Sequence, residues 1–269
     1  MAHDDAGALR AHMSEAEWQA RCDLAALYRL VALHGWDDLI FTHVSARVPA
    51  AQSWVKQADE TYGPGQADHF LINPYGMFFH EMTASDLVKI DSDGRTVGDS
   101  HAMVNPAGFT IHSAIHAAVP QAHFVIHLHT DAMTGVSAQT EGLLPLTQNA
   151  LLIRPQLAYH DYEGVALDLE ERGRIVDDLG GKRFLMLRNH GTLAWGGSAA
   201  EAFASIYFLE QACRQQIAAL SAGRSGVREV SQAVQDKVAP LSQGVAFVGQ
   251  LIWPGLMRRL AREMPGYDA

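Results

Sequence analysis

The chain has 269 residues, 48% of them apolar, which is enough to fill the core of one large domain or two small ones. Its 30 acidic and 20 basic residues give a formal net charge of -10. Because nucleic-acid binding needs a basic surface to meet the phosphate backbone, this balance argues against a nucleic-acid partner and favours small molecules or proteins.

A membrane protein or an exported protein is not expected either. The N-terminal stretch MAHDDAGALRAHMS lacks the basic start and apolar run of a secretory signal, and no apolar segment approaches the roughly 20 residues of a membrane helix. Cys22 and Cys213 lie in amphipathic helical patterns, and their spacing is typical of neither a disulfide framework nor a zinc ribbon. We therefore expect a cytoplasmic protein with both cysteines in its core.

The first predicted elements are a helix and a strand. The helix begins at Ser14, which forms a capping box with Glu17, and it ends at Gly35. A strand is expected over residues 38–48, which are rich in β-branched and aromatic side chains. A polar, glycine-containing excursion over residues 50–67 follows.

Three shorter elements are predicted next. The stretch FLINPYGMFF has the pattern of a strand interrupted at residues 73–76, and TASDLVKI that of a short helix capped by Thr83 and Asp86. A longer helix is expected in NPAGFTIHSAIHAAV, because proline is tolerated in the first turn of a helix, and Pro120 ends it.

Two apolar strands and a long helix complete the predicted order. The strands are AHFVIHLH, directly after Pro120, and RFLMLRNHG at residues 183–191. The helix SAAEAFASIYFLEQACRQQIAAL opens on a second capping box, formed by Ser198 and Glu201.

These elements predict one α/β domain, because strands and helices mix throughout and no internal repeat is visible. We expect a flexible N-terminus over residues 1–13, the domain over residues 14–220, and a helical C-terminal extension over residues 221–269. The linker-like SAGRSG marks the junction before the extension.

Histidines recur along the strand AHFVIHLH. Because successive side chains of a strand point to opposite faces, His123, His127 and His129 share one face. The Cα atoms of His127 and His129 would lie roughly 6.6 Å apart, close enough for both rings to bind one ion at about 2.0 to 2.1 Å. An H-x-H pair alone is equally typical of half-exposed polar residues on an antiparallel strand, so a metal site needs a third ligand.

His190 is the candidate third ligand, because it ends an apolar strand just before a glycine, where the backbone can bend toward a site. Three neutral imidazoles leave an open coordination position, as in catalytic metal sites. Such a set accepts zinc, manganese, iron, cobalt or nickel.

The remaining histidines are expected to have other roles. His112 and His116 lie four residues apart on one helix face, a spacing that can bind metal but is more typical, in an apolar helix, of hydrogen bonding or an interface. We expect the others to be solvated: His3, His12, His34, His69, His80, His101 and His160.

Five stretches resemble the class II aldolase and adducin family: HGWDDLIFTHVSARV, LINPYGMFFHEMTASDLV, NPAGFTIHSAIHAAVP, VIHLHT and LRNHGTLAWG, in that order, over roughly residues 16 to 220. The resemblance implies a three-layer α/β/α fold with a central, mainly antiparallel sheet. It also implies a homotetramer with active sites between subunits that acts on a small-molecule substrate.

The resemblance further implies a metal site. In the family's sugar-phosphate aldolases three histidines hold a divalent metal, usually zinc, and they correspond here to His127, His129 and His190. The metal acts as a Lewis acid that stabilises the enediolate formed when a bond next to a carbonyl breaks. This chemistry serves aldol cleavage and decarboxylation alike.

The sequence also departs from those aldolases. They carry a catalytic glutamate four residues before the helix histidine matched by His112, and this position is Gly108 here. Their phosphate-binding loops are missing too, so a sugar phosphate is not expected. The acid/base therefore stays unassigned; His112 is a candidate, one helical turn after Gly108, with a packed structural histidine as the alternative.

By the same resemblance, His43, Ser45 and Gly76 are candidate substrate-binding residues. His43 stands in the Thr-His pair that replaces the Gly-Asn of the aldolase phosphate loop. A structural loop histidine is the alternative for His43.

Two functions therefore compete. One is a metal-dependent carbon-carbon lyase, of aldolase or decarboxylase type, that acts on a small oxo- or hydroxy-acid, and the retained histidines favour it. The other is a non-catalytic, adducin-like interaction domain that keeps the metal site, and Gly108 favours it.

Overall fold

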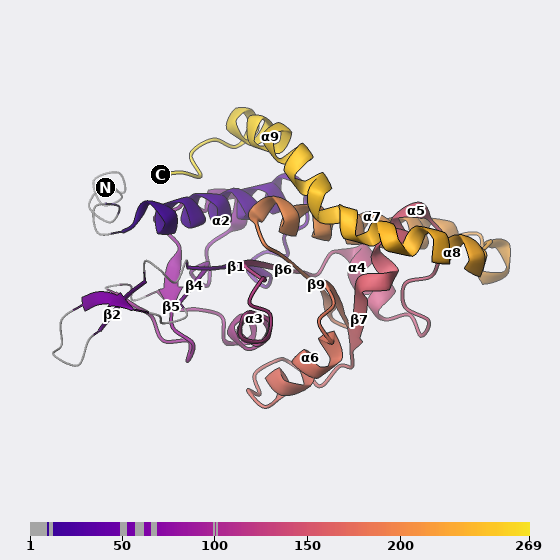
Figure 1. Ribbon diagram of the computed structural model, residues 1–269, viewed down its shortest axis with the longest axis horizontal. Helices are drawn as coiled ribbons and strands as arrows, with labels where there is room; N and C mark the ends of the chain where they lie inside the picture. Colours follow the sequence, from indigo (N-terminus) through magenta and orange to yellow (C-terminus); the bar gives the residue numbers. More distant parts are fainter. Residues whose placement is uncertain are drawn as a thin grey trace.

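A seven-stranded sheet forms the centre of the molecule in a computed structural model (Figure 1), which describes residues 10, 13–48, 53–56, 62–65, 69–98, 100 and 102–269. The strands in sheet order are β5 (Val88–Ile90), β4 (Phe70–Ile72), β1 (His43–Arg47), β6 (Phe124–Leu128), β9 (Gly191–Gly196), β8 (Phe184–Leu187) and β7 (Leu157–His160). Neighbours are antiparallel except β7 and β8, which are parallel. The predicted mainly antiparallel sheet is confirmed.

Helices cover both faces of this sheet, which gives the predicted three layers (Figure 1). One face carries α2 (Glu15–Leu33), α7 (Ala199–Leu220) and α9 (Val245–Glu263), with α4 (Asp131–Ser137) and α5 (Gln148–Ile153) beside α7. The opposite face carries α3 (Pro106–Ala118) and α6 (Glu171–Leu179).

Strand alternation divides the core between the two helical layers. Val44 and Ile126 belong to the cluster packed with α2 and α7. Val125 and Leu193 belong to the cluster packed with α3 and α6. His127 lies two residues after Val125 on β6, so its side chain points to the α3 side of the sheet.

Side-chain caps start the helices where the sequence predicts. The Ser14 hydroxyl accepts the Glu17 backbone N–H at 3.1 Å at the start of α2. The Asn105 side chain accepts from Ala107 at 3.1 Å before α3. Ser198 starts α7 in the same way. Each cap satisfies an N–H group that the helix itself leaves without a partner.

Two local predictions are wrong. The second half of FLINPYGMFF is not a strand but ends in a 3-10 helix, η2 (Phe79–Glu81). TASDLVKI does not form a helix: Thr83 binds the Asp86 carboxylate as predicted, but within a turn, and the chain then enters β5. Val88 and Ile90 are buried on one face of the sheet, whereas Lys89 between them points to the other face and binds Glu17 of α2 at 3.0 Å; this alternation suits a strand better than one helical turn.

The predicted excursion over residues 50–67 contains a two-stranded antiparallel hairpin, β2 (Ser53–Lys56) and β3 (Tyr62–Gly65). The C-terminal segment contains η4 (Arg224–Gly226), α8 (Gln232–Val238), η5 (Ala239–Gly244) and α9. A further 3-10 turn, η3 (Arg154–Gln156), precedes β7.

Because α9 packs along α7 and α2, the domain boundary at residue 220 stays a prediction. Within the described segments, no helix has the length and apolarity needed to cross a membrane.

The Tyr28 hydroxyl ties α2 to the place where β1 and β4 diverge. It accepts the backbone N–H groups of Val44 at 2.9 Å and Asn73 at 3.2 Å, and its one hydrogen faces two acceptors, the Val44 carbonyl oxygen and Asn73 Oδ1. Tyr28 is fully buried, so no water can replace this oxygen. Two buried amides depend on one side chain.

Tyr28→Phe is therefore expected to lower the free energy of unfolding by about 3 kcal/mol, because it leaves two buried N–H groups without an acceptor. Urea denaturation measures the change. The matched control is Tyr207→Phe in α7, whose side chain is partly exposed and which should change stability by about 0.5 kcal/mol or less. Equal stability of the two variants would contradict this role of Tyr28.

Candidate metal centre

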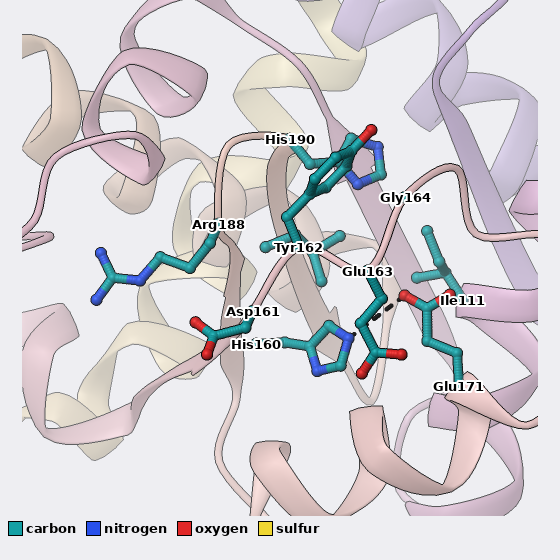
Figure 2. Close-up of a pocket in the computed structure, with 10 residues that line it drawn as sticks. Ile111, His160, Asp161, Tyr162, Glu163, Gly164, Glu171, Arg188 and His190 are labelled. Carbon is teal, nitrogen blue, oxygen red and sulfur yellow. Dashed lines mark hydrogen bonds and ion pairs between the residues drawn. The ribbon is translucent and has the colours of Figure 1, made fainter.

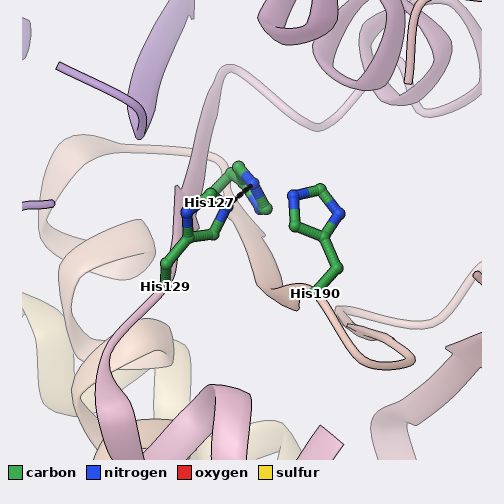
Figure 3. A group of neighbouring side chains, drawn as sticks. All are labelled: His127, His129 and His190. Atoms are coloured by element: carbon green, nitrogen blue, oxygen red, sulfur yellow. Dashed lines mark hydrogen bonds between the residues drawn. The ribbon is translucent and has the colours of Figure 1, made fainter. Parts of the chain in front are cut away.

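His127, His129 and His190 meet at one end of the central strands (Figure 3), and we refer to them as the histidine triad. Each offers one ring nitrogen, and these atoms lie within 4.8 Å of one another. Ring centroids are 4.6 to 4.9 Å apart. Because β6 and β9 are antiparallel neighbours, the end of β6 lies beside the turn that carries His190.

The backbone around His190 permits this approach at two positions. A Cβ atom on Gly191 would lie 2.6 Å from the carbonyl oxygen of Leu128 and 2.8 Å from Cδ2 of His129, so only glycine fits there. Asn189 has a φ of 58°, a left-handed conformation that asparagine tolerates better than most residues. Both residues are needed to bring His190 against β6.

Outer hydrogen bonds orient two of the triad rings. His127 Nδ1 lies 3.0 Å from the Thr192 carbonyl oxygen, which can only accept, so Nδ1 carries the hydrogen. His129 Nδ1 lies 3.2 Å from Asp38 Oδ2 and donates to it. A neutral ring with hydrogen on Nδ1 has a lone pair on Nε2, so both rings direct lone pairs into the triad.

The triad fits a divalent cation. The two Nε2 atoms lie 2.8 Å apart, and two lone pairs at that distance repel each other unless a cation or a proton lies between them. Burial lowers the pKa of His127 well below its ordinary value, lowers that of His129 against the opposing effect of Asp38, and lowers that of His190 to about 4, so a proton is disfavoured. Three neutral imidazole nitrogens gathered in this way are a donor set that divalent zinc accepts.

A small pocket opens beside His190 (Figure 2). Tyr162 and Glu163, from the loop after β7, form one side of it. His160 lies at its edge between Asp178 at 2.7 Å and Glu171 at 3.3 Å.

The prediction of solvated histidines is wrong for His160 and His69, which are 3% and 4% exposed. His34 is half-buried and His80 is exposed. The other three, His3, His12 and His101, lie outside the described residues.

His43 lies next to the triad. It is the direct cross-strand partner of His127 in the β1 and β6 pair, so both rings lie on one face of the sheet, with centroids 4.9 Å apart and planes at 29°. A Cβ atom on Gly108 would lie 2.7 Å from His43 Cδ2. The His43 ring thus occupies the space beside Gly108 in α3.

The other predicted substrate residues lie elsewhere. The Ser45 hydroxyl is buried, 2.5 Å from His112 Nδ1 and 2.7 Å from His116 Nε2. Gly76 lies in an exposed turn after β4 with a φ of 104°, a conformation that favours glycine. His43 therefore contacts the triad directly, Ser45 lies behind it, and Gly76 belongs to a separate turn.

Sequence reasoning missed Asp38, the carboxylate that orients His129. The two residues are 91 positions apart, so no local spacing could have linked them. Leu39, directly after Asp38, has a φ of 48°, a strained conformation for leucine. Leu39 and Asn189 are the two non-glycine residues with positive φ among the described residues, and each adjoins a residue of this centre.

Known proteins share both the sequence and the fold of the chain. The family model of the "Class II Aldolase and Adducin N-terminal domain" matches residues 22–217. A "Putative aldolase class 2 protein" of Caulobacter vibrioides is 58% identical over 260 residues, which are 96% of this chain and 95% of that protein.

Two further similar proteins carry different names. Alpha-adducin of Rattus norvegicus is 44% identical over 204 residues, which are 75% of this chain and 26% of that protein. The structure of L-fuculose 1-phosphate aldolase from Glaciozyma antarctica PI12 is 26% identical with a TM-score of 0.75, over 93% of this chain and 92% of that chain. The chain described here belongs to the class II aldolase and adducin N-terminal domain family.

Proposed function

We propose that this protein is a metal-dependent carbon-carbon lyase, of aldolase or decarboxylase type, that acts on a small oxo- or hydroxy-acid rather than on a sugar phosphate. The observation that carries the proposal is the pair of Nε2 lone pairs, 2.8 Å apart, on two rings that outer hydrogen bonds hold in one tautomer. The likeness to an aldolase of known structure supports the reaction class, and the lack of the aldolases' phosphate-loop residues in the sequence argues against a sugar phosphate.

In this proposal His127, His129 and His190 hold a divalent metal, zinc first, with manganese, iron, cobalt or nickel also acceptable. When bound, such an ion is a Lewis acid for an oxygen next to the bond that breaks. Asp38 and the Thr192 carbonyl keep two of the ligand rings aimed at it, and such outer partners contribute strongly to metal affinity.

Of the three predicted substrate residues His43, Ser45 and Gly76, we propose direct substrate binding for His43, which contacts the triad, and the proton-transfer group stays unassigned. Both ring nitrogens of His112 are hydrogen-bonded, to His43 at 2.8 Å and to Ser45 at 2.5 Å. His112 therefore reaches a substrate through His43 rather than directly. The proposal includes a homotetramer with sites between subunits, acting in the cytoplasm.

The second candidate function is a non-catalytic, adducin-like interaction domain that retains the metal. Gly108 in the glutamate position favours it, and so does the 44% identity to alpha-adducin. Turnover distinguishes the two candidates.

The decisive experiment offers a panel of small oxo- and hydroxy-acids to the zinc-loaded protein and measures release of carbon dioxide or of an aldehyde. The lyase is expected to release one of them from at least one acid, to stop when a chelator removes the metal, and to recover with added zinc. Release that a chelator abolishes would reject the interaction domain. No release from any acid by fully loaded protein would reject the lyase.

Removing one ligand should abolish tight metal binding. His190→Ala leaves two imidazoles, so we expect zinc affinity to fall roughly a hundredfold or more, measured by competition with a chromophoric chelator. His123→Ala is the matched control, because His123 belongs to the same histidine-rich stretch but is exposed and outside the triad. Unchanged zinc content in His190→Ala would contradict the assignment.

A methyl group on Gly191 should have a similar effect without removing a ligand. In Gly191→Ala the new Cβ meets the Leu128 backbone, which cannot move aside as a side chain can, so the turn with His190 must shift. We expect loss of tight zinc binding by the same competition assay. Gly173→Ala in α6 is the control, because its Cβ would meet nothing within 4 Å and alanine favours the helix. Equal zinc affinity of both variants would argue against the close approach.

A further inference from the structure

A buried chain of hydrogen bonds leads away from the triad, and we call it the histidine relay: His43, His112, Ser45 and His116. His43 Nδ1 lies 2.8 Å from His112 Nε2. His112 Nδ1 lies 2.5 Å from the Ser45 hydroxyl, which lies 2.7 Å from His116 Nε2. His116 Nδ1 ends the relay, 2.8 Å from the carbonyl oxygen of Ala122.

The carbonyl at the far end gives every bond of the relay one direction. It can only accept, so His116 carries its hydrogen on Nδ1 and its Nε2 accepts from Ser45. The Ser45 hydroxyl has then used its single hydrogen, so it accepts from His112 Nδ1. His112 Nε2 in turn accepts from His43 Nδ1. The relay therefore leaves the Nε2 atom of His43 with a lone pair.

Each ring of the relay is expected to carry one hydrogen, because all three rings are buried. His43, His112 and His116 are 2%, 2% and 1% exposed. Removal from water disfavours the charged form of such buried rings, and among the described residues no carboxylate is hydrogen-bonded to the relay. The charge of Arg47 near His116 acts in the same direction. Three neutral rings and one hydroxyl supply one hydrogen for each of the four hydrogen bonds of the relay.

The His43 ring lies at the edge of the triad. It stacks on His127 with centroids 4.9 Å apart, so a molecule bound to the triad would lie beside this ring. Among the described residues, none forms a hydrogen bond with His43 Nε2. The Nε2 atom borders Gly108, where a Cβ would lie only 2.9 Å away. The ring keeps this position because residue 108 has no side chain.

We propose that His43 determines substrate specificity: its Nε2 atom accepts a hydrogen bond from a substrate hydroxyl, and the relay holds His43 in the tautomer that can accept. The inference rests on the proposed lyase function and narrows its substrate to an acid that carries a hydroxyl, because an oxo-acid without one offers His43 no donor. His112, Ser45 and His116 are positioning residues, since they act through His43.

The first test observes the tautomer itself. Solid-state ¹⁵N spectra of the sedimented, zinc-loaded full chain, labelled at histidine, distinguish ring nitrogens with and without hydrogen, and the His43 signals are those missing in His43→Phe. We expect hydrogen on Nδ1 and none on Nε2. Ser45→Ala should give a mixture of tautomers, and Ser45→Thr, which keeps the hydroxyl, should restore the single one. Hydrogen on Nε2 of His43 in the wild-type chain would overturn the proposal.

The second test measures specificity with two probes that differ only by a hydroxyl. Lactate and propionate are titrated calorimetrically into zinc-loaded protein, with zinc content measured for each variant. Because lactate can also chelate zinc, the readout is the change in the ratio of the two affinities. We expect that ratio to fall about tenfold in His43→Phe, the value of one lost hydrogen bond, and also in Gly108→Ala, whose Cβ displaces the His43 ring.

Gly108→Ala is included in case His43→Phe does not fold. It is expected to fold, because alanine favours a helix more than glycine does. A ratio unchanged in both variants would overturn the proposal and assign the lactate preference to chelation alone. Neither test depends on turnover. A failed acid panel therefore rejects the lyase and leaves the tautomer result standing, whereas hydrogen on His43 Nε2 rejects only this inference.

Discussion

The antiparallel pairing of β6 with β1 and β9 is the constraint on which the centre depends. It sets His43 opposite His127 and brings the turn with His190 to the end of β6. A slip of one residue in either pairing would turn these side chains to the opposite face, into the apolar cluster beneath α2 and α7. The alternation of apolar side chains on the three strands stabilises both the core and the register of the centre.

A group of neutral imidazoles in a protein interior is costly unless each ring nitrogen is satisfied. Here the cost is offset by two kinds of partner. Backbone carbonyls accept at the outer ends, from His127 to Thr192 and from His116 to Ala122. Side chains connect the rings in between. A carbonyl oxygen can only accept a hydrogen bond. The two backbone carbonyls therefore determine which atom donates in each hydrogen bond that leads from them.

Much of the fold could be predicted from the sequence, since capping residues and strand alternation are local signals. Ser14 and Ser198 start helices as predicted, and the central strands follow their apolar patterns. The helix predicted in TASDLVKI is wrong because the prediction depends on the capping residues and not on the two apolar positions that follow them. Val88 and Ile90 become buried only by pairing with β4. Short segments like this one are decided by tertiary contacts rather than by local propensity.

The candidate site could be predicted in part. The H-x-H spacing and the resemblance identified the three triad residues, but Asp38 and the neighbourhood of Gly108 depend on distant parts of the chain. The resemblance identified a missing carboxylate, whereas only the structure shows that an imidazole from β1 fills that space. An absent side chain in a sequence does not reveal which neighbour takes its volume.

That shared volume has an evolutionary consequence. A glutamate at position 108 and the present His43 ring cannot coexist, because the first carbon of any side chain there meets the imidazole. Gaining the carboxylate alone would displace His43, and losing His43 alone would leave a void beside Gly108. The two arrangements are therefore separated by a coupled pair of substitutions, so relatives that differ at one of these positions are expected to differ at the other.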